Sequence, residues 1–133
     1  MDRGGDGLSV GETASEVGLT AHTLRWYEQE GLVSPVERDT AGHRRYRERD
    51  LNWLRLLIKL RDTGMPVRQM REYAELVRAG DATTGERLRM FLEHRERVLA
   101  RIAELQRDLA AIDHKIDVYR EREHRRDEIT TTW

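Results

Sequence analysis

The chain has 133 residues and a mass of 15.7 kDa, the size of one ordinary domain or of a small domain with one long appendage. Charged residues make up 37% of the sequence and the formal net charge is -1. No apolar run approaches the roughly 18 to 20 residues that a membrane span requires, and the absence of cysteine excludes disulfides and thiolate chemistry. The charged start of the sequence lacks the apolar core of a secretory signal, so we expect a cytoplasmic location.

Two short helices are predicted at the start of the chain. Ser9 and Glu12 fit a capping box, and Gly18 can end the first helix in the left-handed conformation. Thr20 can cap a second helix, which we expect to run to about Glu30. Two capped helices joined by a glycine turn form a helix-turn-helix pattern, which also occurs in helical bundles that bind no DNA.

Residues 32–46 are not periodic and predict a small hairpin with its tip at residues 39–42. The chain as a whole is nearly neutral, but residues 40–47 contain three arginines and no acid: Arg44, Arg45 and Arg47. If the chain binds nucleic acid, its affinity must therefore come from local placement of charge rather than from a bulk basic field.

A third and a fourth helix follow the hairpin. Leu51, Leu54 and Leu57 mark the apolar face of the third helix, which should end at residues 63–64. Pro66 suits the first position of the fourth helix, and Gly80 follows its end.

The remainder of the sequence predicts one long helix with a heptad repeat. Of ten seam positions between residues 88 and 119, nine are apolar and the tenth is Arg95. No equally long partner helix exists in the chain, so we expect a homodimer, and the repeat leaves open whether its helices run parallel or antiparallel. The expected dimer-interface residues are Leu88, Arg95, Ile102, Leu109 and Ile116 at position a and Phe91, Val98, Leu105, Ile112 and Tyr119 at position d.

Four segments stand in this order: TAHTLRWYE at 20–28, EGLV at 30–33, GHRRY at 42–46 and LRDTGMP at 60–66. In these motifs the chain resembles the MerR family of bacterial transcription regulators, from residue 8 to about residue 120. The resemblance implies a mainly α fold, with a winged helix-turn-helix DNA-binding domain followed by a long dimerisation helix in an antiparallel coiled coil. Its implied boundaries are a flexible tail at 1–7, the DNA-binding domain at 8–80, the coiled-coil helix at 83–120 and a short tail at 121–133.

The resemblance also implies a function and its partners. A homodimer would bind a near-palindromic operator in double-stranded promoter DNA and control transcription by distorting that DNA for RNA polymerase. A small-molecule or stress signal would trigger the change, although the effector stays unknown. The residues expected to contact DNA are Thr20, His22, Thr23, Arg25 and Trp26 of the second helix, Arg44, Arg45 and Tyr46 of the wing, and Lys59 and Arg61 at the end of the third helix.

Two other functional classes compete with this interpretation. A coiled-coil interaction module could keep the winged-helix fold without binding specific DNA. An enzyme is disfavoured, because the sequence shows no activated nucleophile, glycine-rich phosphate loop or metal-ligand set, and we therefore expect no catalytic site, metal or cofactor.

Overall fold

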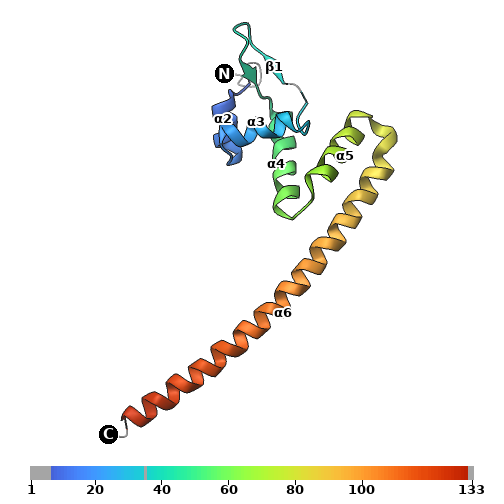
Figure 1. Cartoon of the computed structure of the whole chain (residues 1–133). Coiled ribbons are helices and arrows are strands. Elements are labelled where there is room, and N and C mark those ends of the chain that lie inside the picture. The colour runs from blue at the N-terminus through green and yellow to red at the C-terminus, as the bar shows by residue number, and fades with distance from the viewer. Residues whose placement is uncertain (1–6, 35, 132–133) are drawn as a thin grey trace. The chain divides into compact units, whose positions relative to one another are not determined.

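The computed structural model describes residues 7–34 and 36–131 (Figure 1). It divides between Leu92 and Glu93 into an N-terminal unit and a C-terminal helical unit. The sequence predicts the boundary between the two parts at residues 80–83. In the structure the boundary lies later in the chain, because Met90 and Phe91 pack against the core of the N-terminal unit. Most of the expected tail at 1–7 lies outside the described residues.

The first two helices of the N-terminal unit, α2 (Val10–Val17) and α3 (Ala21–Gln29), form as their capping residues predict. The Ser9 hydroxyl accepts from the Glu12 amide at 3.1 Å, and the Glu12 carboxylate accepts from the Ser9 amide at 2.9 Å. Gly18 ends α2 with a φ of 79°, which is the left-handed conformation. Thr20 then accepts from the Thr23 amide at 3.0 Å and starts α3.

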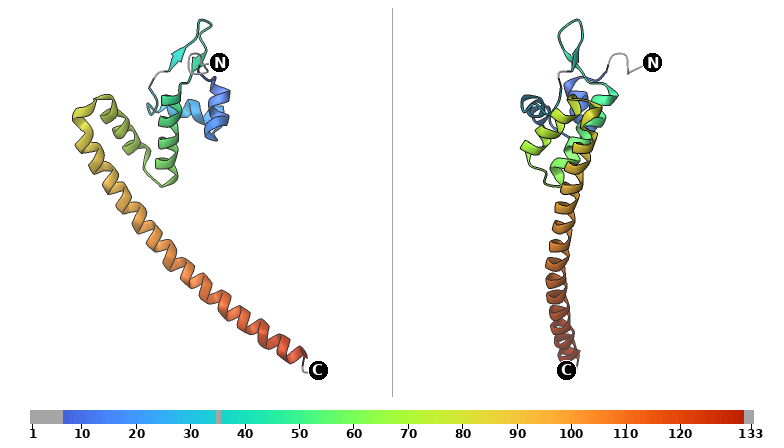
Figure 2. Two further views of the ribbon diagram at one scale, coloured as in Figure 1. Left: turned by 180° about the vertical axis from the view of Figure 1, so that it is seen from behind. Right: turned by 90° about the vertical axis from the view of Figure 1, so that its right-hand side faces the viewer.

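The predicted hairpin consists of β1 (Glu37–Arg38) and β2 (Arg44–Arg45), which pair antiparallel with Arg38 opposite Arg44. Leu8 adds a bridge to Tyr46 through two backbone hydrogen bonds of 2.8 Å. Gly7 makes this approach possible, since its φ is 71° and an added Cβ would lie 2.8 Å from the Tyr46 carbonyl oxygen. In both views of Figure 2 the hairpin extends away from the helices of this unit.

Helices α4 (Glu48–Asp62) and α5 (Val67–Arg78) and a 3₁₀ turn, η1 (Asp81–Thr83), complete the N-terminal unit before the long helix begins. Pro66 is the N-cap of α5 and not its first residue as expected. The core of the unit is formed by side chains from every helix and from the wing: Ala14, Leu24, Tyr27, Leu32, Val33, Tyr46, Leu54, Leu57, Leu60, Met65, Met70 and Tyr73.

An aromatic stack at the edge of this core corrects one interface prediction. Trp53 stacks on Tyr73 with ring centroids 5.4 Å apart, and Tyr73 lies 4.9 Å from Phe91. Phe91 occupies a seam position in the heptad frame, yet its ring belongs to the core of its own chain. A heptad pattern cannot distinguish these two uses of an apolar side chain.

Helix α6 (Thr84–Thr131) is 48 residues long and provides the whole described part of the C-terminal helical unit. The sequence predicts that this helix ends near residue 120 and that a tail follows at 121–133. In the structure the helix continues past residue 120 to Thr131. After Gly85 in its first turn the helix contains neither glycine nor proline. Near its end, Arg125 lies 3.6 Å from the carboxylate of Glu121 and His124 lies 3.0 Å from the carboxylate of Glu128. Among the described residues, no helix is long and apolar enough to cross a membrane.

The side chains of α6 differ from those of the preceding helices in their exposure. Arg95 and most of the apolar side chains predicted for the seam are exposed in the single chain, and Val98 is half-buried. The exposed fractions of the large apolar residues range from 40% to 60%: Leu88, Leu92, Leu99, Ile102, Leu105, Leu109, Ile112, Ile116 and Tyr119. The helix therefore carries an apolar face that its own chain does not cover.

Candidate nucleic-acid interface

Helix α3 buries one side and exposes the other. Leu24 and Tyr27 have exposed fractions of 0% and 3% and fasten the helix to the core. His22 and Arg25 are exposed on the opposite side, together with Gln29 one turn later. Gln29 is not among the contact residues predicted from the sequence, although its spacing of four residues from Arg25 places it on the same helix face. A helix that exposes basic and amide side chains in one row has the form required to read base edges in a major groove.

The two threonines of the predicted site form hydrogen bonds at the start of α3. The Thr20 hydroxyl accepts from the Thr23 amide and donates to the Thr23 hydroxyl at 2.9 Å. Thr20 is exposed and Thr23 is half-buried. These bonds fix the first turn of α3 and so define where His22 points.

Trp26 and Arg61 are brought together from α3 and α4. The Arg61 guanidinium lies 5.0 Å from the centroid of the Trp26 ring, and this ring meets Tyr27 edge-on at 5.2 Å. Lys59 is exposed on the last turns of α4. The contact between Arg61 and Trp26 thus places the last turn of α4 beside α3.

Acidic partners surround the three arginines of the wing. Arg44 Nε lies 2.8 Å from a carboxylate oxygen of Glu28 on α3, and Arg45 Nε lies 3.3 Å from a carboxylate oxygen of Asp39. Arg47 lies 2.7 Å from a carboxylate oxygen of Glu37. The sequence indicated an unneutralised basic segment because residues 40–47 contain no acid, and that interpretation is wrong: the acids come from neighbouring elements.

Tyr46 has a different place from the one that the sequence assigned. Its exposed fraction is 0%, and its hydroxyl donates a hydrogen bond to the Glu28 carboxylate. Burial, and then the hydrogen bond to Glu28, raise the pKa of Tyr46 well above its usual range. The side chain therefore belongs to the core between α3 and the wing, and the expected contact of Tyr46 with phosphate does not fit this position.

Asp39 orders the tip of the hairpin. Its carboxylate accepts from the backbone N–H groups of Ala41 and His43, both at 2.9 Å, in addition to the Arg45 contact. The backbone hydrogen bond from His43 is the largest cause that lowers the pKa of Asp39. The Asp39 carboxylate is thus fixed by the hairpin tip and holds Arg45 on the outer part of the wing.

Two arginines of α5 hold the end of α3 in place. Arg71 pairs with the Glu30 carboxylate and donates to the Glu30 carbonyl oxygen at 3.1 Å. Arg78 donates to the Gly31 carbonyl oxygen at 2.6 Å. These residues are 41 and 47 positions apart from their partners, so no sequence pattern could have found them.

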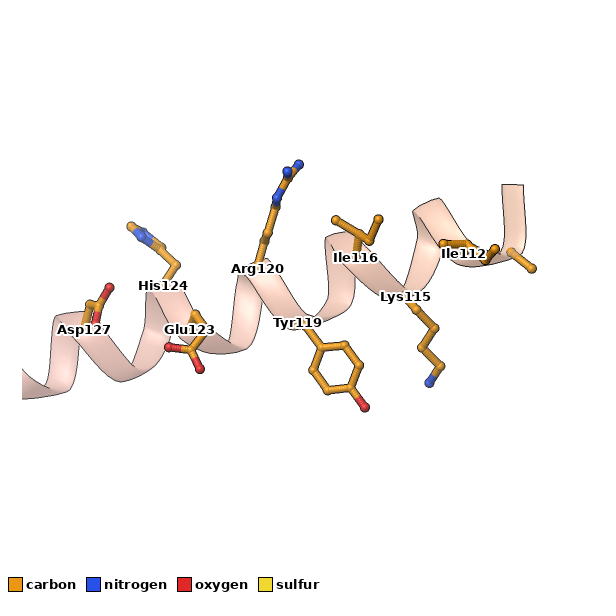
Figure 3. A pocket seen from close by; sticks show the side chains of 9 residues that line it. Ile112, Lys115, Ile116, Tyr119, Arg120, Glu123, His124 and Asp127 are labelled. Atoms are coloured by element: carbon orange, nitrogen blue, oxygen red, sulfur yellow. The ribbon is translucent and has the colours of Figure 1, made fainter. Parts of the chain in front are cut away.

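No group of three or more His, Asp or Glu side chains within the described residues is placed to hold a metal ion. One concave surface is lined by residues of α6 alone, among them Ile112, Ile116 and Tyr119 (Figure 3). Because one helix forms all of it, this surface is part of the exposed apolar face and not an enclosed ligand cavity.

Comparison with known proteins agrees with this geometry. The family described as MerR HTH family regulatory protein matches residues 8–77, and the family described as MerR, DNA binding matches residues 51–115. The chain belongs to the MerR family of transcriptional regulators. An uncharacterised HTH-type transcriptional regulator of Haemophilus influenzae is 40% identical over 84% of this chain and 82% of its own length.

Two solved MerR-family structures share the fold. HiNmlR, described as a MerR family regulator lacking the sensor domain and bound to promoter DNA, has 39% identity and a TM-score of 0.79 over 85% of this chain and 90% of its own. A putative MerR family regulator from Listeria monocytogenes has 31% identity and a TM-score of 0.80 over 84% and 85%.

Proposed function

We propose that this MerR-family regulator binds a near-palindromic promoter operator as a homodimer and controls transcription by distorting the promoter DNA. The observation that carries the proposal is the exposed row on α3, with Arg25 at its centre and Arg44 of the wing held beside the same helix by Glu28. The likeness to a regulator bound to promoter DNA supports it.

Each side chain then has a separate task. Arg25 and His22 read base edges in the major groove, and Arg44, Arg45, Lys59 and Arg61 contact phosphates. Thr20 and Thr23 fix the start of α3, and Trp26 supports Arg61 through its ring face. The acids beside the wing arginines limit the binding of non-specific DNA, since a phosphate must displace or share a carboxylate partner.

The proposal extends to partners beyond DNA. Two copies meet along the exposed apolar face of α6 and present two α3 helices to the two halves of the operator. Distortion of the duplex acts on RNA polymerase at the same promoter, in response to a small-molecule or stress signal. The protein has no catalytic role in this scheme, and its place of action is the bacterial cytoplasm, where the DNA is.

Fluorescence anisotropy on operator DNA tests the contact assignments. The DNA is a duplex selected by the protein from genomic fragments, and a scrambled duplex at the same salt is the control. Arg25→Ala should weaken operator binding by about 1–3 kcal/mol and reduce the preference over the scramble. Arg45→Ala should weaken binding to both duplexes and reduce the salt slope by about one.

Arg107→Ala is the matched control, because this arginine is exposed on α6 at a position away from the seam. It should bind as wild type does. If Arg25→Ala and Arg45→Ala also bind as wild type does, the assigned DNA surface is wrong. Weak, salt-insensitive and equal binding to both duplexes by the wild-type chain would instead favour the interaction module.

A further inference from the structure

The seam of α6 contains charged residues that the apolar repeat alone does not explain. Arg95 occupies a seam position and is exposed, with its guanidinium 3.9 Å from the carboxylate of Glu96. Arg101 flanks the seam and lies 3.2 Å from the carboxylate of Glu104. Both contacts are between exposed side chains on one helix and stabilise little, so neither accounts for the position of these arginines.

The family resemblance already implies an antiparallel pair of α6 helices, and we propose which register this pair takes: it is selected by Arg95 with Asp113 of the partner subunit and by Arg101 with Asp108 of the partner subunit. The inference rests on the proposed function, because it assumes that the second copy is what covers the apolar face. In this register Ile102 lies opposite Leu105 of the partner subunit, and the two-fold axis passes between residues 103 and 104.

The spacing of the exposed apolar residues supports this axis. Two-fold rotation about it places Ile102 on position 105, Leu88 on position 119 and Leu99 within one residue of position 109. The residues at those positions, Leu105, Tyr119 and Leu109, are all exposed apolar side chains on the same helix. The apolar face is therefore nearly symmetric about this point, which an antiparallel pair of identical helices requires.

The charges at and beside the seam disfavour the parallel arrangement, in agreement with the family resemblance. In a parallel pair, residues at position a face each other, so Arg95 would lie against Arg95 of the partner subunit. Flanking positions five residues apart would also meet, which pairs Asp108 with the partner's Asp113 and Lys115 with the partner's Arg120. All three juxtapositions bring like charges together.

The same charges choose among antiparallel registers. In an antiparallel pair the residues that precede position a face one another, and those that follow position d face one another. The proposed register puts Arg101 opposite the partner's Asp108 and Arg95 beside the partner's Asp113, and two-fold symmetry repeats each pair. Asp108 and Asp113 are exposed on α6, and within the described residues Asp108 makes no salt bridge with its own chain.

A shift of one heptad in either direction destroys this complementarity. In one direction Arg101 meets Arg101 of the partner subunit. In the other direction Arg101 meets the partner's Lys115, and Asp108 meets Asp108 of the partner subunit. Among these three registers, only the proposed one satisfies both arginines, and it pairs four layers of the seam: 88 with 119, 95 with 112, 98 with 109 and 102 with 105.

A spin-label distance tests the register directly, and the absence of cysteine makes single labelling simple. A nitroxide on His114→Cys sits away from the seam in the full-length chain. The two labels of the dimer should be separated by about 31 Å along the helix axis, at about 1.5 Å per residue. A shift of one heptad changes this axial separation by about 10 Å, to about 21 or 42 Å, and a parallel pair brings it near zero.

Charge reversal tests the pairs. Arg101→Asp or Asp108→Arg alone should raise the dimer dissociation constant about tenfold, because each creates two like-charge contacts in the dimer. The double variant should return to within about threefold of wild type. Arg107→Asp, on the outer side of α6, is the control and should change the constant less than about threefold.

The outcomes separate the register from the proposed function. A dimer with a different label distance, or a double variant as weak as the two singles combined, overturns the register and leaves the homodimer standing. A chain that sedimentation shows to be monomeric at all concentrations overturns both. A label distance of the expected size together with rescue by the double variant establishes the register.

Discussion

The two units of this chain bury their apolar residues in different ways. In the N-terminal unit, apolar side chains from α2, α3, α4, α5 and the wing fill one core, in which Leu24, Leu54 and Leu57 have exposed fractions of 0%. On α6, residues of the same type remain 40% to 60% exposed. The first unit is thus specified by contacts within one chain, whereas the helical unit needs a second chain to cover its apolar face.

This difference matches a division of tasks in a MerR-family regulator. A surface that reads DNA requires side chains held in fixed positions, and the caps, ion pairs and core contacts of the N-terminal unit provide them. A dimer helix has to set the distance between two such surfaces, which a long helix with a complementary face can do. Substitutions in the two units should therefore have separable effects.

The largest expected effect is on the helical unit. Ile102→Glu introduces a carboxylate into the centre of the seam in both chains, and an unpaired buried charge is costly. We expect the dimer dissociation constant to rise more than about a thousandfold, equivalent to about 4 kcal/mol. Sedimentation velocity over a concentration series measures this constant.

The matched control for that variant is Arg107→Glu, which adds the same carboxylate on the outer side of α6. It should stay dimeric. If Ile102→Glu stays dimeric too, the exposed apolar face is not where two chains meet. If it unfolds the N-terminal unit, which near-ultraviolet circular dichroism would reveal, the two units are not separable as described.

The next largest effect is on the core of the N-terminal unit. Leu54→Ala removes a fully buried side chain, and the loss of its contacts with the cavity left behind should lower the free energy of unfolding by about 3 kcal/mol. Urea denaturation followed by tryptophan fluorescence measures the change. Leu109→Ala, on the exposed face of α6, should weaken the dimer and leave this transition where it is. An equal loss in both variants would contradict the comparison.

A smaller effect concerns the joint between α3 and the wing. Tyr46→Phe removes the hydrogen bond to Glu28 and should lower the free energy of unfolding by about 1.5 kcal/mol at neutral pH. Because folding raises the pKa of Tyr46, its contribution is fully present below the unfolded pKa of about 10 and is lost as the pH rises above that value.

The stability of the wild-type chain should therefore decline above about pH 10 more steeply than that of Tyr46→Phe. Urea midpoints between pH 8 and pH 11 measure the two slopes. Arg107→Ala, on the outer side of α6, is the control and should follow wild type. Parallel slopes for wild type and Tyr46→Phe would mean that Tyr46 is not buried against Glu28 in solution.

Features set by neighbouring residues could be predicted from the sequence, and contacts between distant residues could not. Ser9, Gly18 and Thr20 act within a few residues of their own positions, so the bounds of α2 and the start of α3 follow from them. Arg44 and Glu28 are 16 positions apart, and only the folded chain shows that the wing arginines have acidic partners. Phe91 fits both a seam and a core, and packing against Tyr73 decides between them.

The central claim is that two chains join along α6 and each presents one α3 to DNA. Sedimentation equilibrium of the wild-type chain on a duplex that contains only half of the operator tests this claim most directly. A preformed dimer predicts that every complex has the mass of two chains with one duplex when the protein is in excess, since one α3 binds while the second chain stays attached through the seam, and of two chains with two duplexes when the DNA is in excess. A complex with the mass of one chain and one duplex would contradict the account.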